Sequence, residues 1–200
     1  EPALPLTSGT FAPRAGLATF SSIADSAPDT WGRRLMQRAE RRLAEREGRA
    51  IRTLTESNYL LGVADETRLG ALRFRWVGGD VFQAPVRAGV PALIELGRLL
   101  QITERILRDE ETDEDLRLIF APGSSLGGAR PKASVVDQYG HLSIAKFPKD
   151  TDDYSMETWE EIALRLATQA GISTPHHELI DVDGKAVMLS RRFDRIGAIR

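Results

Sequence analysis

The sequence predicts a mixed α+β fold, in which a largely helical amino-terminal part precedes an antiparallel sheet that carries one helix. Three observations support this prediction. Charged residues and good helix formers fill residues 31–47. Apolar and polar residues alternate in 133–137 and in 141–147, as they do in half-buried strands. Residues 177–190 have the pattern of a β-hairpin, with a turn at Asp183-Gly184.

The composition is that of a globular chain and excludes several classes of protein. Of the 200 residues, 42% are hydrophobic and 28% are charged, so the chain can bury a sizeable core. The formal net charge of -2 gives no overall basic field that would hold nucleic acid. Cysteine is absent, which excludes disulfides and thiolate chemistry. Because no long apolar run and no signal peptide are visible, we expect a cytoplasmic protein without a membrane partner.

Capping residues and apolar spacing predict three helices in the first half. Either Ser26 or Asp29 can cap the helix of residues 31–47. A second helix is predicted at 56–63 and a third at 91–108, where leucines recur on one face. We interpret the acidic run that follows, residues 109–115, as a solvated connection.

Two further segments complete the predicted elements. Alternation of basic and apolar residues in 70–77 predicts a half-buried strand. A glycine turn follows it, and residues 81–83 are predicted to form a second, short strand after the turn. A helix is predicted at 155–170, ended by Gly171. Since the composition changes near residue 120, we expect two domains, 1–118 and 119–200.

The most distinctive segment runs from Ser124 to Lys132, with the sequence Ser-Ser-Leu-Gly-Gly-Ala-Arg-Pro-Lys. Gly127 and Gly128 let the backbone approach a bulky anion, and successive N–H groups in such a turn can form an anion-binding concavity. Arg130 and Lys132 add positive charge. The segment matches neither the Walker A pattern nor Gly-x-Gly-x-x-Gly. The pattern therefore leaves two alternatives open, phosphate binding and a flexible surface turn.

Lys146 is a second candidate for binding phosphate. Strand alternation places it on the same face as Leu142 and Ile144, so we expect its side chain to point toward the apolar side of the sheet. An ammonium group there needs a counter-charge. A nucleotide phosphate would serve, and so would Glu160 or Glu161 of the following helix. The alternative is a lysine at the strand end that reaches water.

Other polar residues carry weaker signals. The end of the last strand, residues 188–195, resembles an ordinary strand with a charged end. The adjacent carboxylates Asp152 and Asp153 are interpreted as solvating a loop. No metal site is predicted, because the histidines lack cysteines or carboxylates at ligand spacing; they are His141, His176 and His177.

Taken together, several motifs resemble the HipA toxin kinases. In order, they are residues 29–35, 65–74, 125–132, 145–148 and 192–195, with the helix of residues 159–171 between the last two. The Gly-Gly-Ala-Arg-Pro-Lys turn and the Phe-Asp-Arg strand end are the most specific of these, and the resemblance covers nearly the whole chain. It implies a HipA amino-terminal subdomain followed by a kinase-like small lobe, without the large catalytic lobe.

The resemblance also implies roles for individual residues. Ser125 would be the loop serine that such kinases autophosphorylate, and Lys146 would contact the ATP phosphates with Glu160 as its partner. Arg191 and Phe193 would offer hinge backbone groups to the adenine. The implied ATP-binding residues are Gly127, Gly128, Ala129, Lys146, Glu160, Arg191 and Phe193.

The family's catalytic aspartate and its magnesium ligands lie in a lobe that would follow Arg200. We therefore expect a parent protein that is a serine/threonine kinase using ATP and Mg²⁺, and a fragment that is inactive alone. The family further implies a helix-turn-helix antitoxin, DNA contact only through that antitoxin, and a protein substrate such as an aminoacyl-tRNA synthetase. The alternative is a non-catalytic regulatory or antitoxin-like module. If the glycine turn and Lys146 bind the same nucleotide, both must lie on the same side of the sheet.

Overall fold

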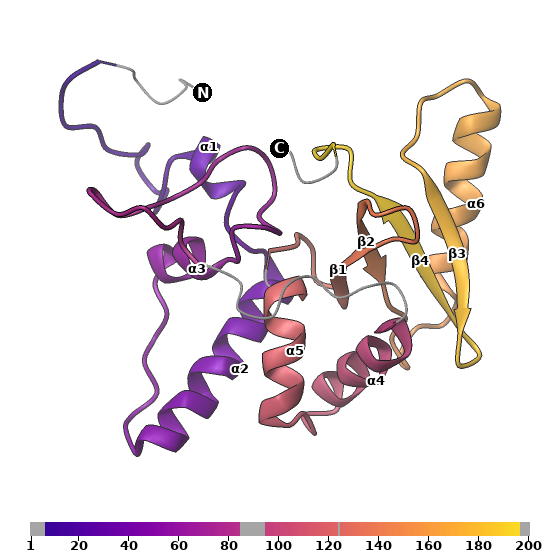
Figure 1. Cartoon of the computed structure of the whole chain (residues 1–200), viewed down its shortest axis with the longest axis horizontal. Helices are drawn as coiled ribbons and strands as arrows, with labels where there is room; N and C mark the ends of the chain where they lie inside the picture. The colour runs from indigo at the N-terminus through magenta and orange to yellow at the C-terminus, as the bar shows by residue number, and fades with distance from the viewer. Residues whose placement is uncertain (1–6, 85–94, 124, 197–200) are drawn as a thin grey trace.

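The computed structural model describes residues 7–84, 95–123 and 125–196, and its architecture is α+β (Figure 1). The six helices within these residues are α1 (Ser21–Ala24), α2 (Thr30–Glu47), α3 (Glu56–Gly62), α4 (Leu96–Leu107), α5 (Asp113–Gly123) and α6 (Met156–Gln169). The strands are β1 (Lys132–Val136), β2 (Leu142–Lys146), β3 (His177–Val182) and β4 (Lys185–Arg191). They form one antiparallel sheet in the order β1-β2-β4-β3.

The strands and α6 follow the sequence prediction for the second half of the chain. Asp183 and Gly184 both have positive φ, 53° and 76°, as the tight β3–β4 turn requires. Ser155 caps α6 by accepting a hydrogen bond from the N–H of Thr158. Figure 1 shows α6 lying along β3 and β4. The predicted α+β class is therefore confirmed, and its hairpins lie where their turns indicated.

The hydrophobic core lies on one face of the sheet. Alternate residues of β1, β2 and β4 point into it, and α2, α4 and α5 cover them. The core residues are Trp31, Leu35, Leu96, Leu99, Leu100, Ile102, Ile106, Ile119, Ala133, Val135, Ala145, Phe147, Val187 and Leu189. Because these come from both sides of the predicted 118/119 boundary, which itself falls inside α5, one core joins the two halves. The division into two domains stays a prediction.

Helix α2 supplies the amino-terminal part of this core. Asp29 is its N-cap, and Gly48 ends it in the left-handed conformation, with φ of 61°. Trp31 and Leu35 lie one turn apart and are both buried, so one stripe of an otherwise charged helix packs on the sheet. Of the two predicted caps, Asp29 is the one used.

Residues 70–83 are a correction to the sequence prediction. They contain no strand, and a single bridge pairs Arg75 with Phe82. Trp76 and Val77 are exposed, so the alternating pattern has no apolar surface on which to pack. The third predicted helix begins at Leu96, and residues 91–94 of that prediction lie outside the described residues.

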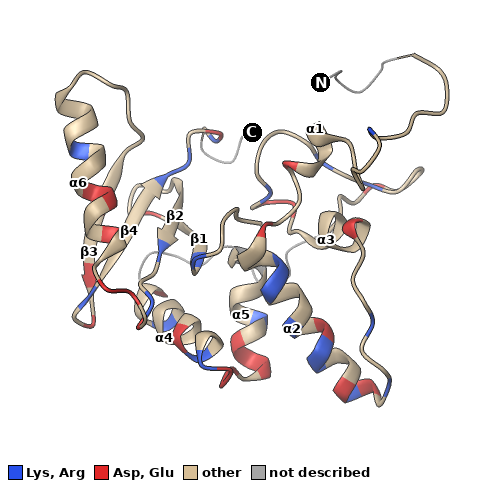
Figure 2. Ribbon diagram, turned by 180° about the vertical axis from the view of Figure 1, so that it is seen from behind, with Lys and Arg blue, Asp and Glu red and all other residues tan. Residues whose placement is uncertain are grey.

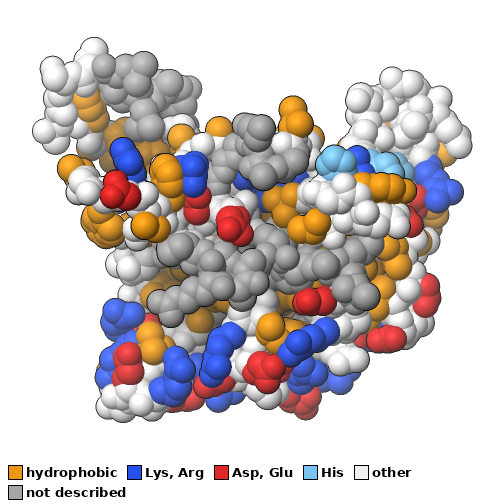
Figure 3. All heavy atoms as spheres, viewed as in Figure 1, with side chains coloured by type: hydrophobic (Ala, Val, Ile, Leu, Met, Phe, Trp, Pro, Cys, Tyr) orange, Lys and Arg blue, Asp and Glu red, His pale blue; other side chains and the backbone are white. Residues whose placement is uncertain are grey.

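The acidic run is a second correction. Figure 2 shows acidic residues of α5 and basic residues of α2 and α4 gathered at one end of the molecule, and Figure 3 shows the two charges intermixed over that surface. Glu111 is buried and accepts hydrogen bonds of 2.6 Å from Arg38 of α2. Asp115 is buried and pairs with Arg105 of α4. The run thus fastens three helices together, because buried carboxylates require such partners.

Within the described part of the chain, none of the helices combines the length and the apolar character that crossing a bilayer requires.

We predict that Asp115 makes the stability of the fold sensitive to acid. Hydrogen bonds from Arg105 lower the pKa of Asp115 from 3.8 to about 2. The ionised form is favoured in the folded state, so its contribution is complete above pH 3.8 and is lost as the pH falls toward 2. We expect a loss of about 1–2 kcal/mol over this window. Urea unfolding at several pH values measures it.

The Asp115→Asn variant should be less stable at pH 6 and should show a flatter pH dependence below pH 4. Glu114→Gln is the matched control, because Glu114 lies on the same turn and its side chain is 71% exposed. A variant with the same acid dependence as the wild type would contradict this role for Asp115.

Candidate functional site

Two lysines face each other across the first two strands. The register pairs Lys132 of β1 with Lys146 of β2, so both side chains project from the same face of the sheet. This face is opposite the core. Ala145 of β2 and Phe147, directly after β2, flank Lys146 in sequence and point into the core. The expectation that Lys146 points toward the apolar side is therefore wrong. Both sets of alternating β2 residues include apolar members, and helix packing decided which set was buried.

Helix α6 supplies the counter-charge for Lys146. The Nζ of Lys146 forms an ion pair with Oε1 of Glu160, and the two side chains are 29% and 36% exposed. The adjacent Glu161 points instead to β3, where Oε2 lies 2.7 Å from Nδ1 of His177. Consecutive helix residues project about 100° apart, so only one of the two glutamates can face β2. Glu160 is that residue.

The glycine turn lies on the same side of the sheet as Lys146. The Nζ of Lys132 donates a hydrogen bond to the carbonyl of Gly127. Burial lowers the pKa of Lys132, and the nearby charge of Lys146 lowers it further. Gly128 has φ of +82°, and a Cβ there would lie 2.6 Å from Nζ of Lys132. Lys132 thus connects the turn to Lys146, and the positive φ of residue 128 favours glycine there.

The amino terminus of α2 holds this turn from the other side. The N–H of Gly128 donates to Oδ2 of Asp29 at 2.8 Å, and the N–H of Trp31 donates to the carbonyl of Gly128 at 2.9 Å. The indole Nε1 of Trp31 donates to the carbonyl of Lys132 at 2.9 Å. Sequence reasoning identified Asp29 as a helix cap and missed its contact with the turn, because the two segments are about 100 residues apart.

Ser125 is enclosed by this packing. Its side chain is 1% exposed, and its Oγ is buried without a hydrogen-bond partner among the described residues. Leu126 is also buried, whereas Ala129 at the outer side of the turn is exposed. A hydroxyl in this position can receive a phosphoryl group only after the turn opens. Autophosphorylation of Ser125 stays a prediction.

Arg130 does not contribute free positive charge to the turn. Its guanidinium donates to Asp152 at 2.7 Å and to the buried Glu157 of α6 at 3.1 Å. Hydrogen bonding to Arg130 lowers the pKa of Asp152 to about 2. Asp152 was interpreted from sequence as a solvated loop residue, and this is wrong. Through Arg130 it connects the loop before α6 to the segment before β1.

The end of β4 is tied to both neighbouring segments. The N–H of Arg191 donates to the carbonyl of His176 at 2.8 Å, so this amide is not available to an adenine. Phe193 is 94% exposed. Arg192 is buried and donates to the carbonyls of Thr67 at 2.7 Å and Arg68 at 3.1 Å. The strand end is therefore more than a charged terminus, because it binds the amino-terminal half.

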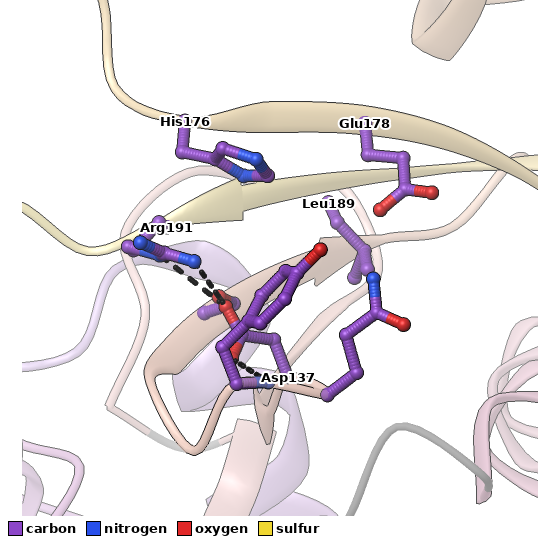
Figure 4. Close-up of a pocket in the computed structure, with 8 residues that line it drawn as sticks. Asp137, His176, Glu178, Leu189 and Arg191 are labelled. Atoms are coloured by element: carbon purple, nitrogen blue, oxygen red, sulfur yellow. Dashed lines mark hydrogen bonds and ion pairs between the residues drawn. The ribbon is translucent and has the colours of Figure 1, made fainter.

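A small surface pocket lies on the core-side face, near the β1–β2 turn. Figure 4 shows Glu178 of β3 and His176, which directly precedes β3, on the same side as Leu189, with Arg191 bonded to Asp137 at 3.1 Å. Lys146 does not line this pocket. The lining residues are Asp137, Gln138, Tyr139, Ser143, His176, Glu178, Leu189 and Arg191. Ser143 and Arg191 are register partners on the face away from Lys146, so the pocket and the lysine pair are separate.

No three His, Asp or Glu side chains among the described residues are grouped so that they could hold a metal ion.

We predict that the two adjacent glutamates of α6 differ in their effect on stability. Burial opposes ionisation of Glu161, but hydrogen bonds from Arg165 and His177 outweigh it and lower its pKa. Glu161→Ala removes a carboxylate that is 6% exposed and should destabilise the chain by about 1–3 kcal/mol. Glu160→Ala removes a partly exposed partner and should change stability by about 0.5 kcal/mol or less. Chemical unfolding of both variants measures the difference; equal losses would contradict it.

Comparison with known proteins agrees with part of the resemblance. Residues 124–200 match the family model described as the HipA-like C-terminal domain. This segment includes the described part of the glycine turn and all of β1, β2, α6, β3 and β4. No curated protein and no solved structure matches the chain. The carboxy-terminal part of the chain is thus similar to the HipA-like C-terminal domain, which supports a relation to the HipA family.

Proposed function

We propose that this chain is the ATP-binding part of a HipA-like serine/threonine kinase, the toxin of a toxin–antitoxin pair. The observation that carries the proposal is the ion pair between Lys146 of β2 and Glu160 of α6, next to Lys132 and the glycine turn. A strand lysine paired with a helix glutamate beside a glycine-rich turn is the arrangement with which kinases hold ATP phosphates. The similarity of residues 124–200 to the HipA-like C-terminal domain is a second, independent support.

The chain's own residues fit a polyphosphate. Lys132 and Lys146 place two ammonium groups on one face, and each has three N–H donors, so each can keep its present partner and still bind an oxygen. Glu160 fixes the direction of Lys146. Gly127, Gly128 and Ala129 would bring backbone close to the phosphates, because the two glycines have no side chain that would stand between backbone and ligand.

The remaining parts of the site belong to the same proposal. The backbone at Arg191 and Phe193 would border the base. Because the Arg191 N–H is already bonded to the carbonyl of His176, Arg191 would not donate this N–H to the adenine. Mg²⁺ would neutralise the phosphate charge of the bound nucleotide.

The proposed partners follow from the proposed family. They are a protein substrate, namely a serine-bearing translation factor such as an aminoacyl-tRNA synthetase, and a helix-turn-helix antitoxin through which DNA is contacted in the cytoplasm. The encoded sequence after Arg200 separates this function from a non-catalytic module. A catalytic aspartate followed by magnesium-binding residues is expected there, and their absence would favour the regulatory module.

We predict that Lys146→Ala weakens ATP binding by about tenfold or more, because it removes a charge-assisted contact to phosphate. Calorimetric titration of the purified chain with ATP, with and without Mg²⁺, measures the affinity. Lys185→Ala is the matched control, since Lys185 is also ion-paired on the sheet but lies at the β3–β4 turn. Its affinity should equal that of the wild type.

Equal ATP affinities for the wild type and Lys146→Ala would remove Lys146 from the site. Circular dichroism of each variant, together with its urea midpoint, shows that the sheet remains folded.

A further inference from the structure

We propose that the carboxylate of Asp29 is an internal competitor for nucleotide phosphate at the Gly128 amide, so that the amino terminus of α2 restrains ATP binding. The inference rests on the proposed function, and it adds a regulatory contact to that site. It starts from the 2.8 Å hydrogen bond between the N–H of Gly128 and Oδ2 of Asp29.

The Asp29 carboxylate has the chemistry of the group that it would exclude. It is an anionic oxygen acceptor on a glycine-turn amide, as a phosphate oxygen would be. The hydrogen bond from Gly128 is the largest of the contributions that lower the pKa of Asp29, and the charge of Lys132 contributes as well. Asp29 therefore lies within the same positive environment that the proposed phosphate would occupy.

The three donors of the site, Lys132, Lys146 and the Gly128 amide, differ in whether they can bind a second acceptor while they keep their present partner. Lys132 binds the Gly127 carbonyl and Lys146 binds Glu160, but an ammonium group has further N–H donors for a second acceptor. The backbone amide of Gly128 has a single hydrogen, and Asp29 holds it. Asp29 and a phosphate oxygen are consequently exclusive at this amide, whereas neither lysine partner needs to leave.

Two bonds besides the one to Asp29 hold the turn against α2. The N–H of Trp31 donates to the carbonyl of Gly128, and the indole Nε1 donates to the carbonyl of Lys132, both at 2.9 Å. Trp31 is buried in the core, so these two bonds are held by packing. Loss of the Asp29 carboxylate should therefore free the Gly128 amide and leave the turn in place. This distinguishes a competitor from a residue that merely supports the turn.

The substitution must preserve the helix cap. Asp29 is also the N-cap of α2, where its side chain accepts a hydrogen bond from the N–H of Thr30 at 2.8 Å. Serine is a good N-cap and is both neutral and shorter than aspartate, so Asp29→Ser retains capping while it withdraws the carboxylate from Gly128. Asp29→Asn is a second variant that removes the charge alone. Asp25→Ser, at an exposed acid in the same connection, is the matched control.

The experiment combines ATP titration with amide hydrogen exchange of the nucleotide-free chain. In Asp29→Ser we expect ATP to bind about 3- to 10-fold more tightly, and the Gly128 amide to exchange faster, because an exposed charge-assisted bond is removed. Asp29→Asn should show a smaller gain in affinity. Asp25→Ser should match the wild type in both measurements.

The outcomes separate this inference from the proposed function. Unchanged or weaker ATP binding in Asp29→Ser, with Lys146→Ala still impaired, would overturn the competition and leave ATP binding intact. If no variant binds ATP while exchange at Gly128 rises, the contact exists but the proposed function fails, and the competition fails with it. Tighter binding in Asp29→Ser that Lys146→Ala abolishes supports both.

Discussion

The rest of the structure depends on how Trp31 is buried at the start of α2. Its indole lies in the core, its backbone N–H binds the carbonyl of Gly128, and its Nε1 binds the carbonyl of Lys132. One side chain therefore joins the first long helix to the glycine turn and to β1, across about 100 residues of sequence. Because β1 is paired in register with β2, this contact also fixes where Lys146 stands relative to the turn.

The two faces of the sheet differ in composition and in the helices that contact them. One is apolar and covered by α2, α4 and α5, whereas the other carries the paired lysines and is approached by α6. Every cation of the candidate site already has a carboxylate or carbonyl partner within the chain, which offsets the cost of placing two ammonium groups side by side. A ligand that binds at such a face must share or displace these internal partners, so its affinity depends on which of the partners can be shared.

The parts of the fold that sequence reasoning predicted correctly are local. The Asp183-Gly184 turn and the caps Asp29 and Ser155 each require only a few neighbouring residues, and the helices and strands beside them formed as predicted. The errors involved partners distant in sequence. Residues 70–83 alternate like a strand but have no sheet beside them, and the acids at Glu111 and Asp152 are bonded to arginines from other elements.

By itself, the sequence determined the α+β class, the hairpins, and the residue types gathered around the glycine turn. It also identified Glu160 and Glu161 as the candidate carboxylate partners of Lys146, with a nucleotide phosphate or water as the alternatives. Only the tertiary structure decided that Glu160 faces the lysine, that the lysine face lies away from the core, and that Asp29 holds the Gly128 amide. The physical reason is that turns and caps are satisfied within one segment. The direction of a side chain on a two-sided strand or helix is set by what packs against it.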